Sequence, residues 1–123
     1  MNIKFYHTNH KKLWNWLAEN PDKEKGDWPE WAENGGNVSS YRSPFCLACE
    51  YVNSVNNDVR DCDLCPLIWP PNSYGDRVCD GKNGLWLVWD GFGKSESEED
   101  RIIRSKIALQ ITNLPVKDGV ETI

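Results

Sequence analysis

The chain has 123 residues, a formal net charge of −5, seven tryptophans and five cysteines. This length is typical of one domain, which we expect to span residues 1–123, and the acidity disfavours nucleic acid as a partner because like charges repel. No apolar stretch is long enough for a membrane span. The polar N-terminal residues "MNIKFYHTNHKK" lack the apolar region of a signal peptide, so we expect a cytoplasmic protein.

The first predicted element is an amphipathic helix over about residues 9–19. Thr8 or Asn9 is suited to capping its start, and Pro21 is expected to end it. Its apolar side chains recur at helical spacing, and they are Leu13, Trp14, Leu17 and Ala18.

A second, shorter helix is predicted next. Pro29 suits the first turn of a helix, and the pair Gly35-Gly36 is expected to end this one. Trp28 and Trp31 would then lie on its buried side.

The C-terminal part has the clearest helical pattern, over about residues 96–114. Ser95 and Glu98 match the spacing of a capping box, and the acidic run Glu96–Asp100 suits the positive end of the helix dipole. Pro115 is expected to end the helix. One apolar stripe is predicted to face the core, formed by Ile103, Ile107, Ile111 and Leu114.

Two segments leave alternatives open. The stretch "LWLVWDGF", residues 85–92, is compatible with a short strand or with an apolar helical turn. The tail after Pro115 is compatible with a loose end or with an edge strand. The centre of the chain is rich in turn-forming residues and is expected to be mostly irregular.

That centre holds two Cys-x-x-Cys pairs. Cytosolic thiols stay reduced, so clustered cysteines indicate metal binding rather than disulfides. Each pair presents two thiolates to one metal, and two pairs provide the four tetrahedral ligands that structural zinc prefers. We therefore predict one structural zinc ion, and its expected ligands are Cys46, Cys49, Cys62 and Cys65.

Other side chains are weaker candidates for that site. Cys79 could replace one of the four ligands, although a buried thiol is the commoner state of such a residue. His7 and His10 are distant in sequence, and a surface or packing role is expected for each. The predicted fold class is α+β, as a small single domain with N- and C-terminal helices and an irregular, zinc-stapled centre.

The sequence does not favour catalysis. Four protein ligands leave a zinc ion no open position, and neither the His-x-Glu of zinc deaminases nor a complete phosphate loop is present. We expect a protein that is not an enzyme and that acts by interaction, since tryptophan is enriched in binding hot spots. Trp69 is expected at such a surface or as a lid over the zinc. The acidic run Glu96–Asp100 either meets a basic partner or only stabilises the start of its helix.

The order of several motifs resembles a family of small phage and prophage proteins of Gram-positive bacteria. These motifs are "KKLWNWLAENPDKEKGDWPEW", "CLACEY", "CDLCPLIW", Cys79 with "GLW", and "ITNLPVKD". The resemblance covers most of the chain. It implies that all five cysteines recur in this order, which adds weight to Cys79 as a ligand, but it brings no established activity.

The chain is also similar in type to zinc-containing anti-CRISPR proteins that act on type II-A Cas nucleases. This resemblance implies a non-enzymatic inhibitor in the host cytoplasm that binds the nuclease and blocks DNA loading or cleavage. An acidic surface suits that role because the nuclease has a positively charged nucleic-acid channel. Anti-CRISPR families share no motif, so no contact residue is implied. The alternative is a zinc-ribbon-like module that binds nucleic acid or a phage assembly partner.

Overall fold

The computed structural model describes residues 4–31, 47–48, 51–52, 65–79, 81–93 and 97–123. The helices with both ends in these ranges are α1 (His7–Glu19), η1 (Lys25–Asp27), η2 (Pro29–Trp31), α3 (Leu85–Gly91) and α4 (Glu98–Thr112), and residues 47–48 and 51–52 are also helical. The described ranges contain isolated bridges but no longer strand, and the bridges are Phe5↔Thr122 and Leu67↔Val116. The described chain is therefore mostly helical, and these bridges are its only β contribution to the expected α+β class.

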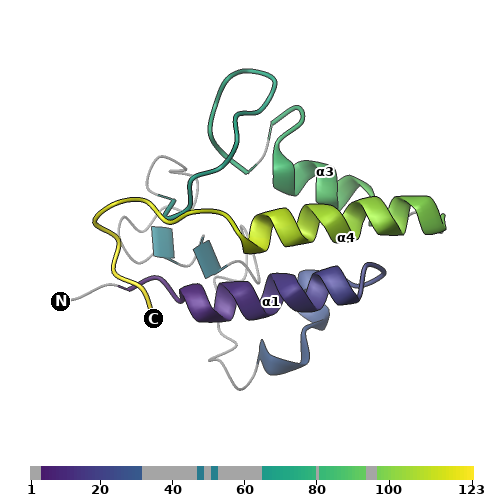
Figure 1. Ribbon diagram of the computed structural model, residues 1–123, viewed down its shortest axis with the longest axis horizontal. Coiled ribbons are helices and arrows are strands. Elements are labelled where there is room, and N and C mark those ends of the chain that lie inside the picture. Colours follow the sequence, from purple (N-terminus) through teal and green to yellow (C-terminus); the bar gives the residue numbers. More distant parts are fainter. Residues whose placement is uncertain (1–3, 32–46, 49–50, 53–64, 80, 94–96) are drawn as a thin grey trace.

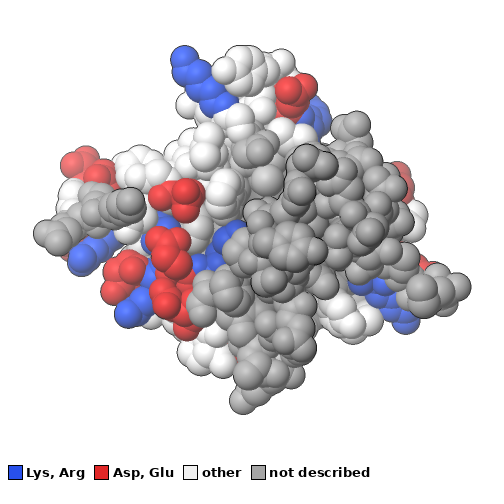
Figure 2. Space-filling view, turned by 180° about the vertical axis from the view of Figure 1, so that it is seen from behind, with Lys and Arg blue, Asp and Glu red and all other residues white. Residues whose placement is uncertain are grey.

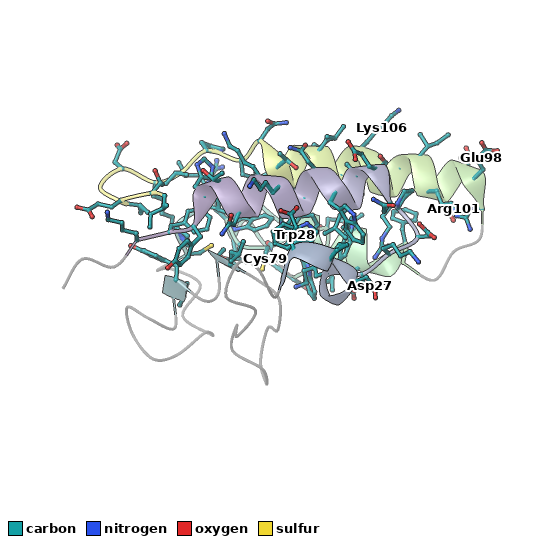
Figure 3. The ribbon with its side chains drawn as sticks, turned by 90° about the horizontal axis from the view of Figure 1, so that it is seen from below. Asp27, Trp28, Cys79, Glu98, Arg101 and Lys106 are labelled. Atoms are coloured by element: carbon teal, nitrogen blue, oxygen red, sulfur yellow. The ribbon has the colours of Figure 1, made fainter. Side chains whose placement is uncertain are left out.

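Helices α1 and α4 lie side by side and run in opposite directions (Figure 1). Seen from below, they form one layer, with α3 and the two 3-10 turns packed beneath it (Figure 3). The two ends of the described chain meet, because Thr8 donates its backbone N–H to Ile123 O at 2.9 Å beside the Phe5↔Thr122 bridge. The tail is thus held by backbone bonds rather than loose.

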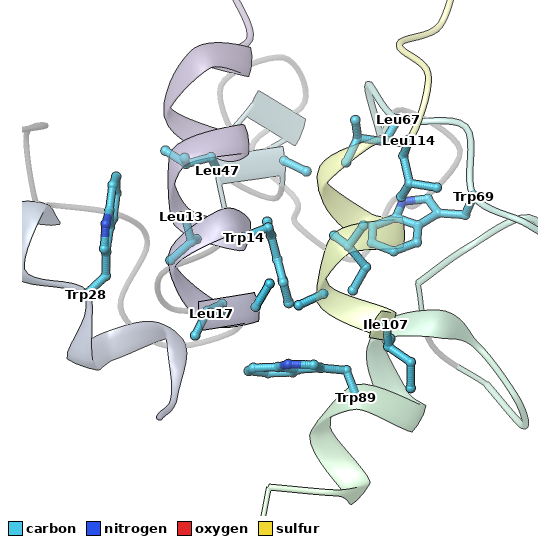
Figure 4. Close-up of a cluster of buried hydrophobic side chains, with 14 of the residues drawn as sticks. Leu13, Trp14, Leu17, Trp28, Leu47, Leu67, Trp69, Trp89, Ile107 and Leu114 are labelled. Atoms are coloured by element: carbon cyan, nitrogen blue, oxygen red, sulfur yellow. The ribbon is translucent and has the colours of Figure 1, made fainter. Parts of the chain in front are cut away.

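Aromatic side chains from three helical segments form much of the core (Figure 4). Trp14 of α1 meets Trp89 of α3 edge to face, with ring centroids 4.9 Å apart. Trp28 is 2% exposed, as predicted, and Trp69 is 4% exposed. The surface position expected as one alternative for Trp69 is therefore wrong, because its ring fills the gap beside α4.

The helix starts differ from the predictions. Helix α1 begins at His7, after Tyr6 and without a side-chain cap, so Thr8 and Asn9 lie inside it. Helix α4 is capped by Ser97, whose Oγ accepts the backbone N–H of Asp100 at 3.4 Å. The predicted capping box at Ser95 is wrong because a serine two residues later occupies the cap position.

The buried stripe of α4 also differs from the prediction. Ile107, Ile111 and Leu114 are buried, but Ile103 is 37% exposed. The position on the buried face is taken instead by Arg104, whose exposed fraction is 0%. Residues 85–91 form a helix, which decides between the two alternatives for that segment.

The guanidinium of Arg104 connects three parts of the chain. Its Nε donates to Trp89 O at 3.0 Å, and its Nη1 donates to Pro21 O and to Lys23 O, both at 2.8 Å. Its Nη2 pairs with Glu24 Oε1 at 3.0 Å, and its centre lies 3.9 Å from the Trp89 ring centroid. A planar guanidinium with five donors suits this arrangement, which a lysine ammonium would not reproduce.

Two further contacts join α1 to α4. Ser105 Oγ donates to Ala18 O, and His10 Nε2 lies 3.0 Å from Ile111 O. A carbonyl oxygen only accepts, so the neutral His10 ring carries its proton on Nε2. His10 is 2% exposed, and burial lowers its pKa to about 4. The packing role expected for His10 is therefore confirmed.

Replacing Arg104 with Met should lower the free energy of unfolding by about 1–3 kcal/mol. The variant removes the side-chain donor of Trp89 O, Pro21 O and Lys23 O, together with the ion pair to Glu24. Arg101→Met, at an exposed position of the same helix, should change stability by at most about 0.5 kcal/mol. Urea unfolding of the two variants measures this difference, and equal midpoints would contradict the role assigned to Arg104.

Folding should also lose stability as the pH falls from about 6.5 to about 4. In this range the unfolded chain protonates His10 whereas the folded chain does not, so protons favour unfolding. The loss from this residue is on the order of 3 kcal/mol. His10→Gln keeps a donor for Ile111 O without titrating, so unfolding of the wild type and this variant across pH isolates the effect. If the free energy of unfolding falls equally with pH in the wild type and in His10→Gln, protonation of His10 does not cause the loss of stability.

Candidate functional site

The predicted zinc site is only partly within the described residues. Cys46, Cys49 and Cys62 lie outside them, whereas Cys65 and Cys79 are partly buried and pack against the hydrophobic core. Among the described residues, no group of three or more His, Cys, Asp or Glu side chains is placed to hold a metal ion. Zinc binding therefore stays a prediction from the cysteine spacing.

The segment that carries Cys65 is firmly attached to the C-terminal tail. Leu67 and Val116 form an antiparallel bridge. On its two sides, Ile68 donates its N–H to Pro115 O and Lys117 donates to Pro66 O, both at 2.8 Å. Backbone bonds therefore fix the position of the chain directly after Cys65.

The Cys65 sulfur has a defined donor. Trp69 Nε1 lies 3.3 Å from Cys65 Sγ, and the indole N–H donates to the sulfur. Donation to a sulfur that carries charge is stronger than donation to a neutral thiol. The contact fixes the direction of the Cys65 side chain, while the expected role of Trp69 as a lid over the zinc stays a prediction because most of that site lies outside the described residues.

Cys79 has a second, backbone role. Its carbonyl oxygen accepts the N–H groups of Trp86 and Leu87 at 3.0 and 3.2 Å, so it satisfies donors in the first turn of α3. The helix itself follows Gly84, which offers no side-chain cap. The position of Cys79 is therefore set by α3, whether or not its thiol binds metal (Figure 3).

A compact loop leads from Trp69 to Cys79. Asn72 is 8% exposed, and its Oδ1 accepts the backbone N–H groups of Tyr74 and Asp76 at 2.9 and 3.1 Å. Ser73 donates its backbone N–H to Lys82 O at 2.7 Å. This loop is thus held by the Asn72 side chain and by a backbone bond to the turn before α3.

The two histidines form a different cluster, at the start of α1. The rings of His7 and His10 stack at 6.1 Å, and Phe5 packs against both. Burial, and then the charge of Lys11, lower the pKa of His7. Both rings are therefore packed within an aromatic cluster rather than grouped with Cys65 or Cys79.

Acidic side chains gather on one side of the molecule (Figure 2). They lie where α1 ends and α4 begins, together with the 3-10 turns and α3. We call this set the acidic end, and its exposed carboxylates belong to Glu19, Asp22, Glu24, Asp27, Asp90, Glu98 and Glu99. The basic residues of the same segments are Lys23, Lys25, Arg101 and the buried Arg104.

The outer face of α4 also exposes aliphatic side chains. Ile102 and Leu109 are 51% and 44% exposed. Seven residues are nearly two helical turns, so these two side chains lie along one line, opposite the buried Ile107 and Ile111. The sequence-based prediction concerned only the core-facing stripe and did not include this pair, although its spacing is visible in the sequence.

No family model, curated protein or solved structure matches the chain at a significant level. The resemblance to phage proteins therefore stays a prediction. Within the described ranges, no helix is both long enough and apolar enough to cross a membrane.

If the predicted zinc site exists, protein purified without added metal should contain about one zinc per chain and should unfold in chelator. Cys49→Ser and Cys62→Ser should each lower the melting temperature and the zinc content, because structural zinc contributes directly to folding. Elemental analysis and thermal melting measure both effects. Cys79→Ser is the matched variant: loss of zinc there, with zinc retained in Cys65→Ser, would replace Cys65 by Cys79 in the ligand set.

Proposed function

We propose that this chain is a non-enzymatic, phage-encoded protein that inhibits a host type II-A Cas nuclease by binding it. The observation that carries the proposal is the acidic end, whose seven exposed carboxylates come from the end of α1, the turns after it, the end of α3 and the start of α4. Such a surface complements the positively charged channel in which these nucleases hold nucleic acid. The choice of this nuclease as target comes from the resemblance in type given by the sequence.

The outer face of α4 supplies an apolar contact next to these charges. Ile102 lies one turn after Glu98, and Leu109 continues the same line. Charged residues steer association and set specificity, whereas a few apolar anchors provide most of the binding energy. The acidic end and the Ile102/Leu109 pair together provide a surface with charged residues for steering and apolar side chains for binding energy.

The predicted zinc has an architectural role in this proposal. With four cysteine ligands it would hold the centre of the chain, and no step of inhibition needs an open metal position. The contact surface lies on α4 and the adjoining turns, which Arg104 holds together without the metal.

Mixing the protein with guide-loaded type II-A Cas nuclease, before and after target DNA is added, tests the proposal. We expect a stable complex by size exclusion and loss of DNA binding by gel shift when the protein is added first. Ile102→Ala with Leu109→Ala should weaken the complex by about 10-fold or more, and Glu98→Lys with Glu99→Lys should slow association.

Tyr74→Ser provides the matched control, because Tyr74 is 73% exposed but lies in the loop after Trp69, away from α4. Its complex should be unchanged. Absence of a complex, with DNA cleavage unimpaired, would contradict the proposed target. Direct, salt-sensitive binding of the chain alone to DNA would instead support the nucleic-acid-binding alternative.

A further inference from the structure

The turn before α3 carries an Asn-Gly pair. Residues 81–84 form this turn, which the backbone N–H of Gly84 closes by donating to Gly81 O at 2.8 Å. Asn83 has a φ of 64°, in the left-handed region that asparagine tolerates better than most residues. Its side chain is exposed, so solvent reaches an amide group that directly precedes a residue without a side chain.

An Asn-Gly pair has a specific chemical reactivity. When hydroxide removes its proton, the glycine nitrogen attacks the asparagine Cγ atom, and the new C–N bond closes a succinimide ring. The bond from Cγ to the side-chain nitrogen breaks, and this nitrogen takes a proton from water and leaves as ammonia. Water then opens the ring to aspartate or isoaspartate, so the net change is the gain of one water and the loss of one ammonia. Glycine favours the attack because it has no Cβ and the greatest backbone freedom.

Hydrogen bonds oppose this attack in the folded chain. The N–H of Gly84, which must lose its proton, donates to Gly81 O. Asn83 Nδ2, the leaving nitrogen, donates to Ser73 Oγ at 2.6 Å, which fixes the direction of the side chain. Ser73 is itself held in place, because its backbone N–H donates to Lys82 O at 2.7 Å. The nucleophile and the group that it attacks are thus restrained separately, one by the turn and the other by the neighbouring loop.

We propose that Asn83 is a site of spontaneous deamidation and that Ser73 limits its rate by restraining the side-chain amide. The bond between these two side chains is exposed, so it opens more readily than a buried one, and the reaction proceeds from the open form. The product has one more negative charge and lacks the Nδ2 donor to Ser73. Isoaspartate also lengthens the main chain by one carbon atom, so the turn before α3 changes with it. This inference is independent of the proposed function and of the predicted zinc site.

Incubation of the full chain at mildly alkaline pH, followed by peptide mass spectrometry, measures conversion at Asn83. The folded wild type should convert more slowly than the same chain in urea, where the other Asn-Gly pair, Asn34-Gly35, is the reference and should convert at a similar rate. Ser73→Ala should speed conversion in the folded protein by about 5-fold, the effect of losing one hydrogen bond from the closed form. Ser97→Ala is the matched control, since it removes the hydroxyl of another exposed serine, the cap of α4, and should leave the rate at Asn83 unchanged.

Asn83→Asp provides the chromatographic reference for the aspartate product. Equal rates of conversion in folded Ser73→Ala and folded wild type would overturn the role of Ser73. An equal gain in rate in Ser97→Ala would also contradict that role, because the effect would then come from global stability. Conversion of Asn34 without conversion of Asn83 in urea would overturn the site itself.

Discussion

The buried guanidinium of Arg104 is the interaction on which the described structure most depends. It joins α4 to the carbonyl of Trp89 in α3 and to the carbonyls of Pro21 and Lys23 after α1. A buried charge is costly unless it is paired and hydrogen-bonded, and here the guanidinium donates to three carbonyls and to the carboxylate of Glu24 while its centre lies over the face of an indole ring. The arrangement defines how α1, α3 and the connecting turns sit around α4.

The same contact shapes the surface of the molecule. Because Arg104 draws the turn after α1 and the end of α3 toward α4, acidic residues from separate segments lie together at one end. Only Glu24 of this group pairs with the buried guanidinium, and its side chain remains 53% exposed. The remaining carboxylates face solvent and leave a field that a basic partner would complement. Fold and proposed function are therefore connected through one residue.

The opposite part of the described chain is organised by backbone bonds. Leu67 bridges Val116, and Phe5 bridges Thr122, so the tail ties the segment after Cys65 to the start of α1. Trp69 then fills the space beside α4 and directs its N–H to the Cys65 sulfur. Cys65, a predicted metal ligand, is thus held between the core and the C-terminal tail.

The sequence by itself determined the helices α1 and α4, because apolar side chains at 3.6-residue spacing require a helix that buries one face. It also determined the acidic charge and the paired cysteines. Only the tertiary structure decided that residues 85–91 are helical and that Arg104 replaces Ile103 on the buried face of α4. The reason is physical: periodicity treats an arginine as a surface residue, and its burial is favourable only when partners distant in sequence meet it. The contact between Trp69 and Cys65 belongs to the same class, since packing against α4 and the tail sets its direction.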